Sequence, residues 1–294
     1  MVVDCFTFFN ELDLLEIRLN ELNPVVDKFV LVEATHTHQF KPKPLYYAEN
    51  KERFSNFHNK IVHVVVDKYP PNPENTPWIY ERHQRNMIAE GLKGFSDDDF
   101  ILVSDLDEIP RPSSIQQALK NDGMSIFIQD CYYYFINCIN SSPQGNDEPY
   151  KWTGTVMARK KLIDNKFSPQ FLRDVSIHAL SANHPRFISR MVWKWWKFKK
   201  LTLKGVPVHF MQNAGWHFSY LGGVDRIIAK IESFAHNEFN KPEFKNPERI
   251  GEAIRNGEDI FGRGYTYSFV KVDDTYPTYI LNNLKKFSSL IMHT

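Results

Sequence analysis

The stretch DDDFILVSDLDEIPRP, residues 97–112, ends a run of apolar residues on a cluster of carboxylates. The run 100–104 is typical of a buried strand, and Asp105, Asp107 and Glu108 follow it directly. Residues two apart in an extended chain point the same way, so Asp105 and Asp107 are predicted to project together. Two neighbouring carboxylates repel each other unless a cation lies between them. Oxygen ligands suit a hard divalent ion, Mg²⁺ or Mn²⁺, which often binds substrate phosphates as well.

The alternative interpretation of this cluster is a solvated loop after a strand. The helix predicted over 78–92 favours a binding site, because it leads into the acidic strand and carries Arg82, Arg85 and Asn86 on one face. The two arginines could contact a diphosphate or form salt bridges with the carboxylates of 105–108. A surface helix face paired with its own glutamates is the other possibility.

The elements that must position these residues alternate along the first hundred residues. Apolar runs predict buried strands and apolar residues at helical spacing predict helices. The predicted strands are 2–9, 27–35, 60–67 and 100–104, and the predicted helices are 10–22 and 78–92. This alternation predicts a mostly parallel sheet with helices on both faces. Ligands of such sheets bind beyond the carboxyl ends of the strands, which is where the carboxylates lie.

The second half of the sequence is less regular and predicts a mixed sheet. We expect a strand over 125–136, a strand or loop over 191–203, a strand over 213–223 that ends in a glycine turn, and a helix over 224–239. Because no repeat, low-complexity tract or clear linker is present, we predict a single α/β domain over 1–294, whose second half completes the sheet and the site.

Composition excludes some partners and sets the expected compartment. With 42% hydrophobic residues in 294, the chain can bury a sizeable core. A net charge of +1 gives no global field that recruits nucleic acid or a membrane. Three cysteines without a CxxC motif indicate a reducing compartment. Without a signal peptide or a bilayer-spanning apolar run, a soluble or cytoplasmic protein of viral or bacterial origin is expected, although a longer protein trimmed of its anchor would give the same pattern.

Five segments resemble the glycosyltransferases of family 17, namely FFNELDLLEIRLNEL, VDKFVLVEATHTHQFKPKPL, ERHQRN, ILVSDLDEIPRP and NAGWHFSYLGG. They follow the order and similar spacing of that family from about residue 3 to about residue 270, with little match between about 130 and 205. The combination of DxDEIP and AGWHxS in one chain is specific. The resemblance implies a GT-A-like fold, a nucleotide-sugar donor, a divalent metal at the DxD motif and inversion at the anomeric carbon. The best-known donor of the family is UDP-N-acetylglucosamine.

The resemblance also implies metal and donor residues. A late histidine completes the metal shell in many GT-A enzymes, so the predicted ligands are Asp105, Asp107 and His217. A packed, half-buried histidine on a strand is the alternative for His217. Glu33 and Thr35 follow the second strand, where such folds hold the nucleoside. The predicted donor-binding residues are Glu33, Thr35, Arg82, Arg85, Asn86 and Asp105.

An inverting transferase needs a general base on the acceptor side, and two carboxylates are candidates. Asp225 opens the helix after the GWHFS strand, where it could instead be a helix cap or first-turn acid. Glu238 in SFAHNEF is its rival. If neither serves, the next residues to consider are Asp130, Glu148 and Asp174.

The predicted function is metal-dependent transfer of N-acetylglucosamine from UDP-N-acetylglucosamine to a glycan hydroxyl. Residues 1–112 would form the nucleotide-sugar-binding half and residues 113–294 the acceptor-side half. The basic aromatic stretch with Trp193, Trp195 and Trp196 could stack acceptor sugars or belong to the core. Alternatives are a different nucleotide sugar, a sugar nucleotidyltransferase or phosphohydrolase, and a non-catalytic carbohydrate-binding protein. A nucleotidyltransferase would need a glycine-rich phosphate loop near the N-terminus, which FTFFNELD lacks.

Overall fold

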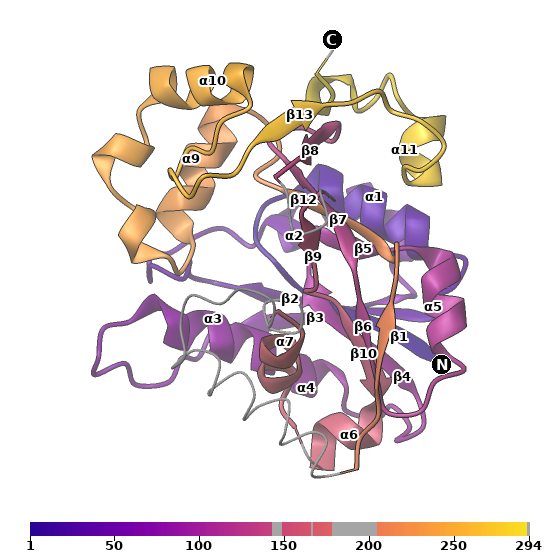
Figure 1. Cartoon of the computed structure of the whole chain (residues 1–294). Helices are drawn as coiled ribbons and strands as arrows, with labels where there is room; N and C mark the ends of the chain where they lie inside the picture. The colour runs from indigo at the N-terminus through magenta and orange to yellow at the C-terminus, as the bar shows by residue number, and fades with distance from the viewer. Residues whose placement is uncertain (143–148, 166, 178–204, 293–294) are drawn as a thin grey trace.

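A computed structural model of the chain describes residues 1–142, 149–165, 167–177 and 205–292 (Figure 1). Its larger sheet, sheet A, has seven strands in the spatial order β11-β6-β10-β4-β1-β2-β3. These strands are β1 (Val2–Phe8), β2 (Lys28–Ala34), β3 (Ile61–Val66), β4 (Phe100–Asp105), β6 (Met124–Phe127), β10 (Val156–Arg159) and β11 (Val208–Met211).

The first four strands of sheet A run parallel to one another, as predicted. In the register of the sheet, Cys5 on β1 lies opposite Val30 on β2 and Val103 on β4. Strand β10 is antiparallel to both of its neighbours, β4 and β6, whereas β11 is parallel to β6. The prediction of a mostly parallel sheet is therefore confirmed.

Helices cover both faces of sheet A. Successive residues of a strand point to opposite faces, so they contribute to different hydrophobic cores. Phe6 and Leu31 contribute to one core, and Cys5 and Val30 contribute to the other. The helices that pack on the first core include α1 (Leu12–Leu22), α5 (Pro112–Ala118) and α11 (Thr278–Asn282). Those that pack on the second include α4 (Ile88–Gly91), α6 (Lys160–Asn165) and α7 (Pro169–Ile177).

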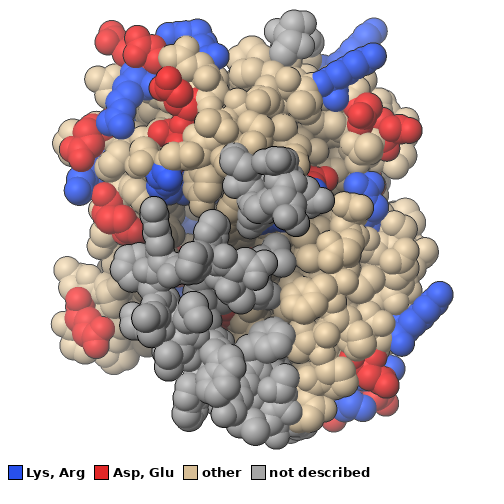
Figure 2. Space-filling model, viewed as in Figure 1, with Lys and Arg blue, Asp and Glu red and all other residues tan. Residues whose placement is uncertain are grey.

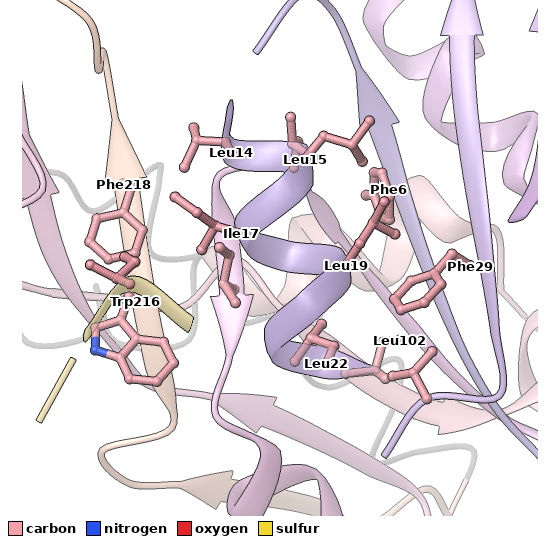
Figure 3. Close-up of a cluster of buried hydrophobic side chains, with 14 of the residues drawn as sticks. Phe6, Leu14, Leu15, Ile17, Leu19, Leu22, Phe29, Leu102, Trp216 and Phe218 are labelled. Atoms are coloured by element: carbon pink, nitrogen blue, oxygen red, sulfur yellow. The ribbon is translucent and has the colours of Figure 1, made fainter. Parts of the chain in front are cut away.

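Helix α1 lies between sheet A and the second sheet, and it is buried on nearly every side. Figure 3 shows its leucines between Phe6 and Phe29 of sheet A and Trp216 and Phe218 of the second sheet. This double contact explains why more of the helix is buried than the single leucine stripe of the sequence predicts.

The second sheet, sheet B, is mixed and is formed mainly by the second half of the chain. Its strands in spatial order are β13 (Tyr267–Phe269), β8 (Cys138–Asn140), β7 (Gln129–Tyr133), β12 (Gly215–Ser219) and β5 (Glu108–Pro110), with β9 (Lys151–Trp152) paired to β7. Strand β12 is parallel to β7 and antiparallel to β5. Helices α9 (Val224–Ser233) and α10 (Pro247–Asn256) pack together on a third core, beside β7, β8 and β13.

Three predicted elements differ from the structure. The helix predicted over 224–239 ends at Ser233, and Asn237–Phe239 form a separate 3₁₀ helix. The strand predicted over 125–136 is divided at Ile128, so that β6 belongs to sheet A and β7 to sheet B. The sequence pattern does not show this division, because most residues of both halves are buried. The predicted helix 78–92 begins at Pro77 and is divided at Met87 into α3 (Pro77–Asn86) and α4. The segment 191–203, with its tryptophans, and Glu148 lie outside the described residues.

The α/β class predicted from the sequence, with a GT-A-like parallel sheet and a mixed second half, agrees with this architecture. Strands β2 and β3 lie on one side of β1 and β4 on the other, so the winding of the chain reverses between β1 and β4. Open α/β sheets bind their ligands at such a switch point. On the face seen in Figure 2, acidic and basic side chains are interspersed. No helix among the described residues has both the length and the apolar character needed to cross a bilayer.

Candidate active site

A cavity of about 1020 Å³ lies at the carboxyl ends of β1 and β4, at the switch point of sheet A. Residues 7–9 and 105–108 contribute to it from the strand ends, and α3, α7, β12 and α9 supply other parts of its lining. Its volume is at the upper end of the range, about 300–1,000 Å³, that is typical of small-molecule sites. The predicted location of the site, beyond the strand ends, contains a cavity of the right size.

The turn after β4 is fixed from behind by a buried arginine. Arg18 on α1 has no exposed surface, and its guanidinium donates to the carbonyl oxygens of Asp105, Leu106 and Glu108 at 3.0, 3.1 and 2.8 Å. The carboxylate of Asp4 on β1 balances its charge and accepts two hydrogen bonds from it, at 2.8 and 2.6 Å. Because one rigid guanidinium binds three carbonyls of the turn, the turn holds its side chains in place.

Asp105 is held by two arginines from different helices. Its two carboxylate oxygens accept from Arg85 of α3 and Arg173 of α7, each at 2.8 Å. Burial favours the neutral acid, but the two guanidinium groups hold the pKa of Asp105 well below its usual value. Strand β4 ends at Asp105 and residues 106–107 form a turn, so the extended spacing used to predict paired projection of Asp105 and Asp107 does not apply.

A second group of side chains has the composition of a metal site. Asp107, Glu108 and His217 are all buried, and each places one ligand atom within 4.8 Å of the others. The imidazole Nε2 of His217 lies 3.7 Å from Oδ2 of Asp107. Burial disfavours the charged imidazole, but Asp107 raises the pKa of His217 to about 10. Of the three predicted metal ligands, the structure brings Asp107 and His217 together, whereas Asp105 is not a member of this group.

Glu108 is fully buried and already has several partners. Its carboxylate accepts from the indole N–H of Trp152 at 2.5 Å and from the backbone N–H of Asp105 at 3.1 Å, and it pairs with Arg173. Burial raises the pKa of Glu108, against the opposing effect of Arg173. Trp152 also stacks on His217, with ring centroids 4.6 Å apart. Gly154 lies behind this cluster, where an added Cβ would collide with both Glu108 and Arg173.

Lys230 on α9 is a second cationic partner of Asp107, beside His217. Its Nζ lies 2.9 Å from Oδ2 of Asp107 and 3.8 Å from Glu11, and 5.1 Å from the centre of the Tyr220 ring. Burial disfavours the charged amine, but Asp107 raises the pKa of Lys230 above its ordinary value. Neither Lys230 nor Arg173 was predicted from the sequence.

The predicted donor residues on α3 divide into three different environments. Arg85 is buried and bound to Asp105, Glu81 and Gln170, so its guanidinium is already committed. Arg82 is exposed and lines the cavity, and no ion pair or hydrogen bond joins it to the rest of the described chain. Asn86 does not line the cavity but accepts from the backbone of Gln170 on α7.

The residues predicted to contact the nucleoside lie behind the cavity wall. Glu33 is fully buried and accepts from the backbone N–H of Tyr47 at 2.9 Å and from His63 at 3.0 Å. Thr35 is half-buried and interacts with Tyr69 at 3.1 Å. Neither is among the residues that line the cavity, although 36–38, which follow Thr35 directly, are.

The two predicted bases are also outside the cavity lining. Asp225 is exposed in the first turn of α9, and Glu238 is exposed and bonded to His236 at 2.6 Å. Among the residues named as further possibilities, Asp130 pairs with Lys151, whereas Asp174 on α7 lines the cavity. The cavity at the switch point of sheet A thus combines a group that could hold a metal with basic side chains, features that suit an anionic small molecule.

Residues 1–137 match the model of glycosyltransferase family 17, which confirms the resemblance predicted from the sequence. The chain is 31% identical to the beta-1,4-mannosyl-glycoprotein 4-beta-N-acetylglucosaminyltransferases of Rattus norvegicus and Homo sapiens. Each alignment covers 99% of this chain, and the chain spans about half the length of these relatives, 54% and 55% respectively. Among solved structures, a mannosyltransferase from Pyrobaculum calidifontis in complex with GDP-Man and Mn²⁺ is similar over 87% of this chain and 65% of its own, with 11% identity and a TM-score of 0.43.

Proposed function

We propose that this chain is a glycosyltransferase that moves N-acetylglucosamine from UDP-N-acetylglucosamine to a hydroxyl of a mannose-containing glycan, with inversion at the anomeric carbon. One observation carries the proposal. Metal-ligand atoms of Asp107, Glu108 and His217 line a cavity at the switch point of a chain whose first 137 residues match family 17. The names of the similar mammalian enzymes supply the donor sugar and the acceptor class.

The residues of the site fit a divalent metal, Mn²⁺ or Mg²⁺. Asp107 offers a carboxylate oxygen, the donor type that Mn²⁺ and Mg²⁺ favour, and His217 adds an imidazole nitrogen. A metal ion bound there would neutralise the charge that develops on the leaving diphosphate. Glu108 is the third member of this group. Trp152 and Arg173 hold its carboxylate in place, within reach of a metal bound by Asp107 and His217.

The chain's own cations would bind the rest of the diphosphate. Arg82 lines the cavity without an ion-pair partner among the described residues, so its guanidinium is available to a ligand. Arg85 and Arg173 instead orient Asp105 from two sides. Of the two arginines predicted to bind donor, we therefore assign that role to Arg82 and give Arg85 a positioning role.

Replacing Arg82 with alanine should raise the KM for donor about tenfold, because a charged hydrogen bond to the diphosphate is lost. The KM for acceptor and the melting temperature should change little, since the side chain is exposed and makes no ion pair with the described residues. Arg85→Ala should lower the melting temperature, because it leaves Asp105 with one arginine fewer. Steady-state kinetics and thermal unfolding of both variants test this assignment. A donor KM that rises with Arg85→Ala alone would contradict it.

The acceptor hydroxyl needs a base that faces the cavity, and Asp174 meets this requirement whereas Asp225 and Glu238 do not. Its carboxylate accepts from Gln170 at 2.8 Å, one turn earlier on α7. Asp174→Asn keeps the size of the side chain and removes its basicity. We expect kcat to fall by about 10²-fold or more with donor affinity unchanged, the usual effect of losing a general base.

Asp225→Asn and Glu238→Gln are the matched variants for this experiment, because both make the same chemical change outside the cavity. They should retain nearly the full rate. If Asp225→Asn were inactive and Asp174→Asn active, the assignment made from the sequence would be restored.

Metal-dependent binding of UDP tests the proposed function directly. Calorimetry should show UDP affinity in the presence of Mn²⁺ and its collapse when EDTA is added. Release of UDP from a panel of UDP-sugars then separates the proposed donor from another nucleotide sugar. A non-catalytic carbohydrate-binding protein would bind glycan in the same panel and release no UDP, and equal UDP affinity with and without metal would contradict the metal site.

A further inference from the structure

Lys230 forms an ion pair with Asp107, the carboxylate that a metal would need. Its Nζ binds Oδ2 of Asp107 at 2.9 Å, and the same oxygen is the one closest to His217, at 3.7 Å. A divalent ion shared by Asp107 and His217 would therefore lie next to the ammonium group. A divalent ion and the ammonium group would repel each other strongly at this distance, because the site is largely shielded from water.

Each acid of the turn already has a cationic partner within the chain itself. Asp105 has Arg85 and Arg173, Glu108 has Arg173, and Asp107 has Lys230 and the imidazole of His217. A metal ion alone would add two positive charges to this set. A metal ion together with a diphosphate would add charges of both signs, so the pair is accepted where the metal alone is not.

Lys230 is the cation of this set that can move. The side chains of Arg85 and Arg173 are each 3% exposed, whereas that of Lys230 is 25% exposed and lines the cavity. A lysine has a flexible stem with a compact charge at its end, and Glu11, 3.8 Å away, offers a second anchor. Helix α9 can stay in place while the ammonium group changes partner.

We propose that Lys230 is an internal cation that holds Asp107 while the site is empty and passes to the donor's diphosphate when the metal takes its place. This inference rests on the proposed function and adds an order to it. The site binds the metal weakly by itself and tightly together with a nucleoside diphosphate, because the diphosphate provides the new partner for Lys230. The residue is thus both a competitor of the free metal and a ligand of the loaded donor.

The affinity of the whole chain for Mn²⁺ tests the inference without measuring activity. Electron paramagnetic resonance measures it, because the signal reports the concentration of free Mn²⁺. Lys230→Met and Lys230→Gln remove the competing charge, so each should bind Mn²⁺ at least about tenfold more tightly than the wild type when no nucleotide is present. Lys230→Arg keeps the charge and should bind Mn²⁺ as weakly as the wild type. With UDP added, the wild type should gain more Mn²⁺ affinity than either neutral variant, and the neutral variants should bind UDP more weakly.

Lys245→Met is the matched control, because Lys245 forms a similar ion pair with Glu232, at 3.0 Å, and is 24% exposed but does not line the cavity. It should bind Mn²⁺ like the wild type. Melting curves of the two neutral variants establish that they are folded. If Mn²⁺ binds the neutral variants and the wild type equally well, the inference is wrong and the proposed metal site remains. If Mn²⁺ binds none of them even with UDP, the metal site and the inference are both wrong.

Discussion

Replacing Asp107 with alanine should reduce sugar transfer by at least about 10³-fold, because the variant loses the carboxylate that would hold the metal. A metal ion contributes several kcal/mol to stabilising charge in a transition state, and each 1.36 kcal/mol is a factor of about ten in rate. The turn itself should persist, since its backbone is held by Arg18 and by a hydrogen bond from the N–H of Phe218 to the carbonyl of Asp107. Turnover with saturating donor and Mn²⁺, alongside a melting curve, is the measurement.

Asp98→Ala provides the control, because Asp98 is an exposed acid just before the same strand and pairs with Lys161 at 3.1 Å. This variant should keep the wild-type rate. Unchanged turnover and unchanged Mn²⁺ dependence in Asp107→Ala would mean that the acidic turn is only a loop.

Replacing Arg18 with methionine should destabilise the protein by about 3–5 kcal/mol, the usual cost of leaving a buried charge without its partner. Arg18 and Asp4 are both fully buried, and the variant leaves Asp4 uncompensated and three turn carbonyls without their donor. At about 2–4 °C per kcal/mol, the melting temperature should fall by on the order of 10 °C. Thermal and denaturant unfolding measure the loss.

The double variant Asp4→Leu with Arg18→Met separates charge from packing. It removes both ions, so it should be more stable than Arg18→Met alone. Arg249→Met is the surface control, since Arg249 is exposed and donates to the carbonyl of Glu243, and it should change stability by no more than about 0.5 kcal/mol. A melting temperature of Arg18→Met that equals that of Arg249→Met would contradict the role given to the buried pair.

Local patterns along the chain were sufficient to predict the parallel part of the fold. Strands β1 to β4 are apolar runs of six or seven residues that end at turn signals, and each forms where the sequence predicts it. The same argument placed the carboxylates of 105–108 at a ligand-binding edge, and the cavity lies there. The division of 125–136 between two sheets could not be predicted, because it depends on partner strands far along the chain.

The cations of the site were missed for a related reason. Lys230 follows its partner Asp107 by 123 residues, and Arg173 follows Glu108 by 65. In the sequence, each looks like an ordinary charged residue of an amphipathic helix. Only the folded structure places it beside the turn at 105–108. Asp225 stays a prediction as the base, and its exposed position in the first turn of α9 is one that the helix dipole also favours.

The pairing of charges across the cavity limits how the chain can be cut or recombined. Residues 1–137 match a family model, yet the acids they contribute, Asp107 and Glu108, are buried against cations from beyond residue 137. A fragment that ends there would keep the carboxylates and lose Arg173 and Lys230. A chimera of two relatives joined at this boundary must therefore carry compatible cations in its second part, or Asp107 and Glu108 will be buried without their cationic partners. The segment that a sequence comparison finds most easily is thus not an interchangeable module.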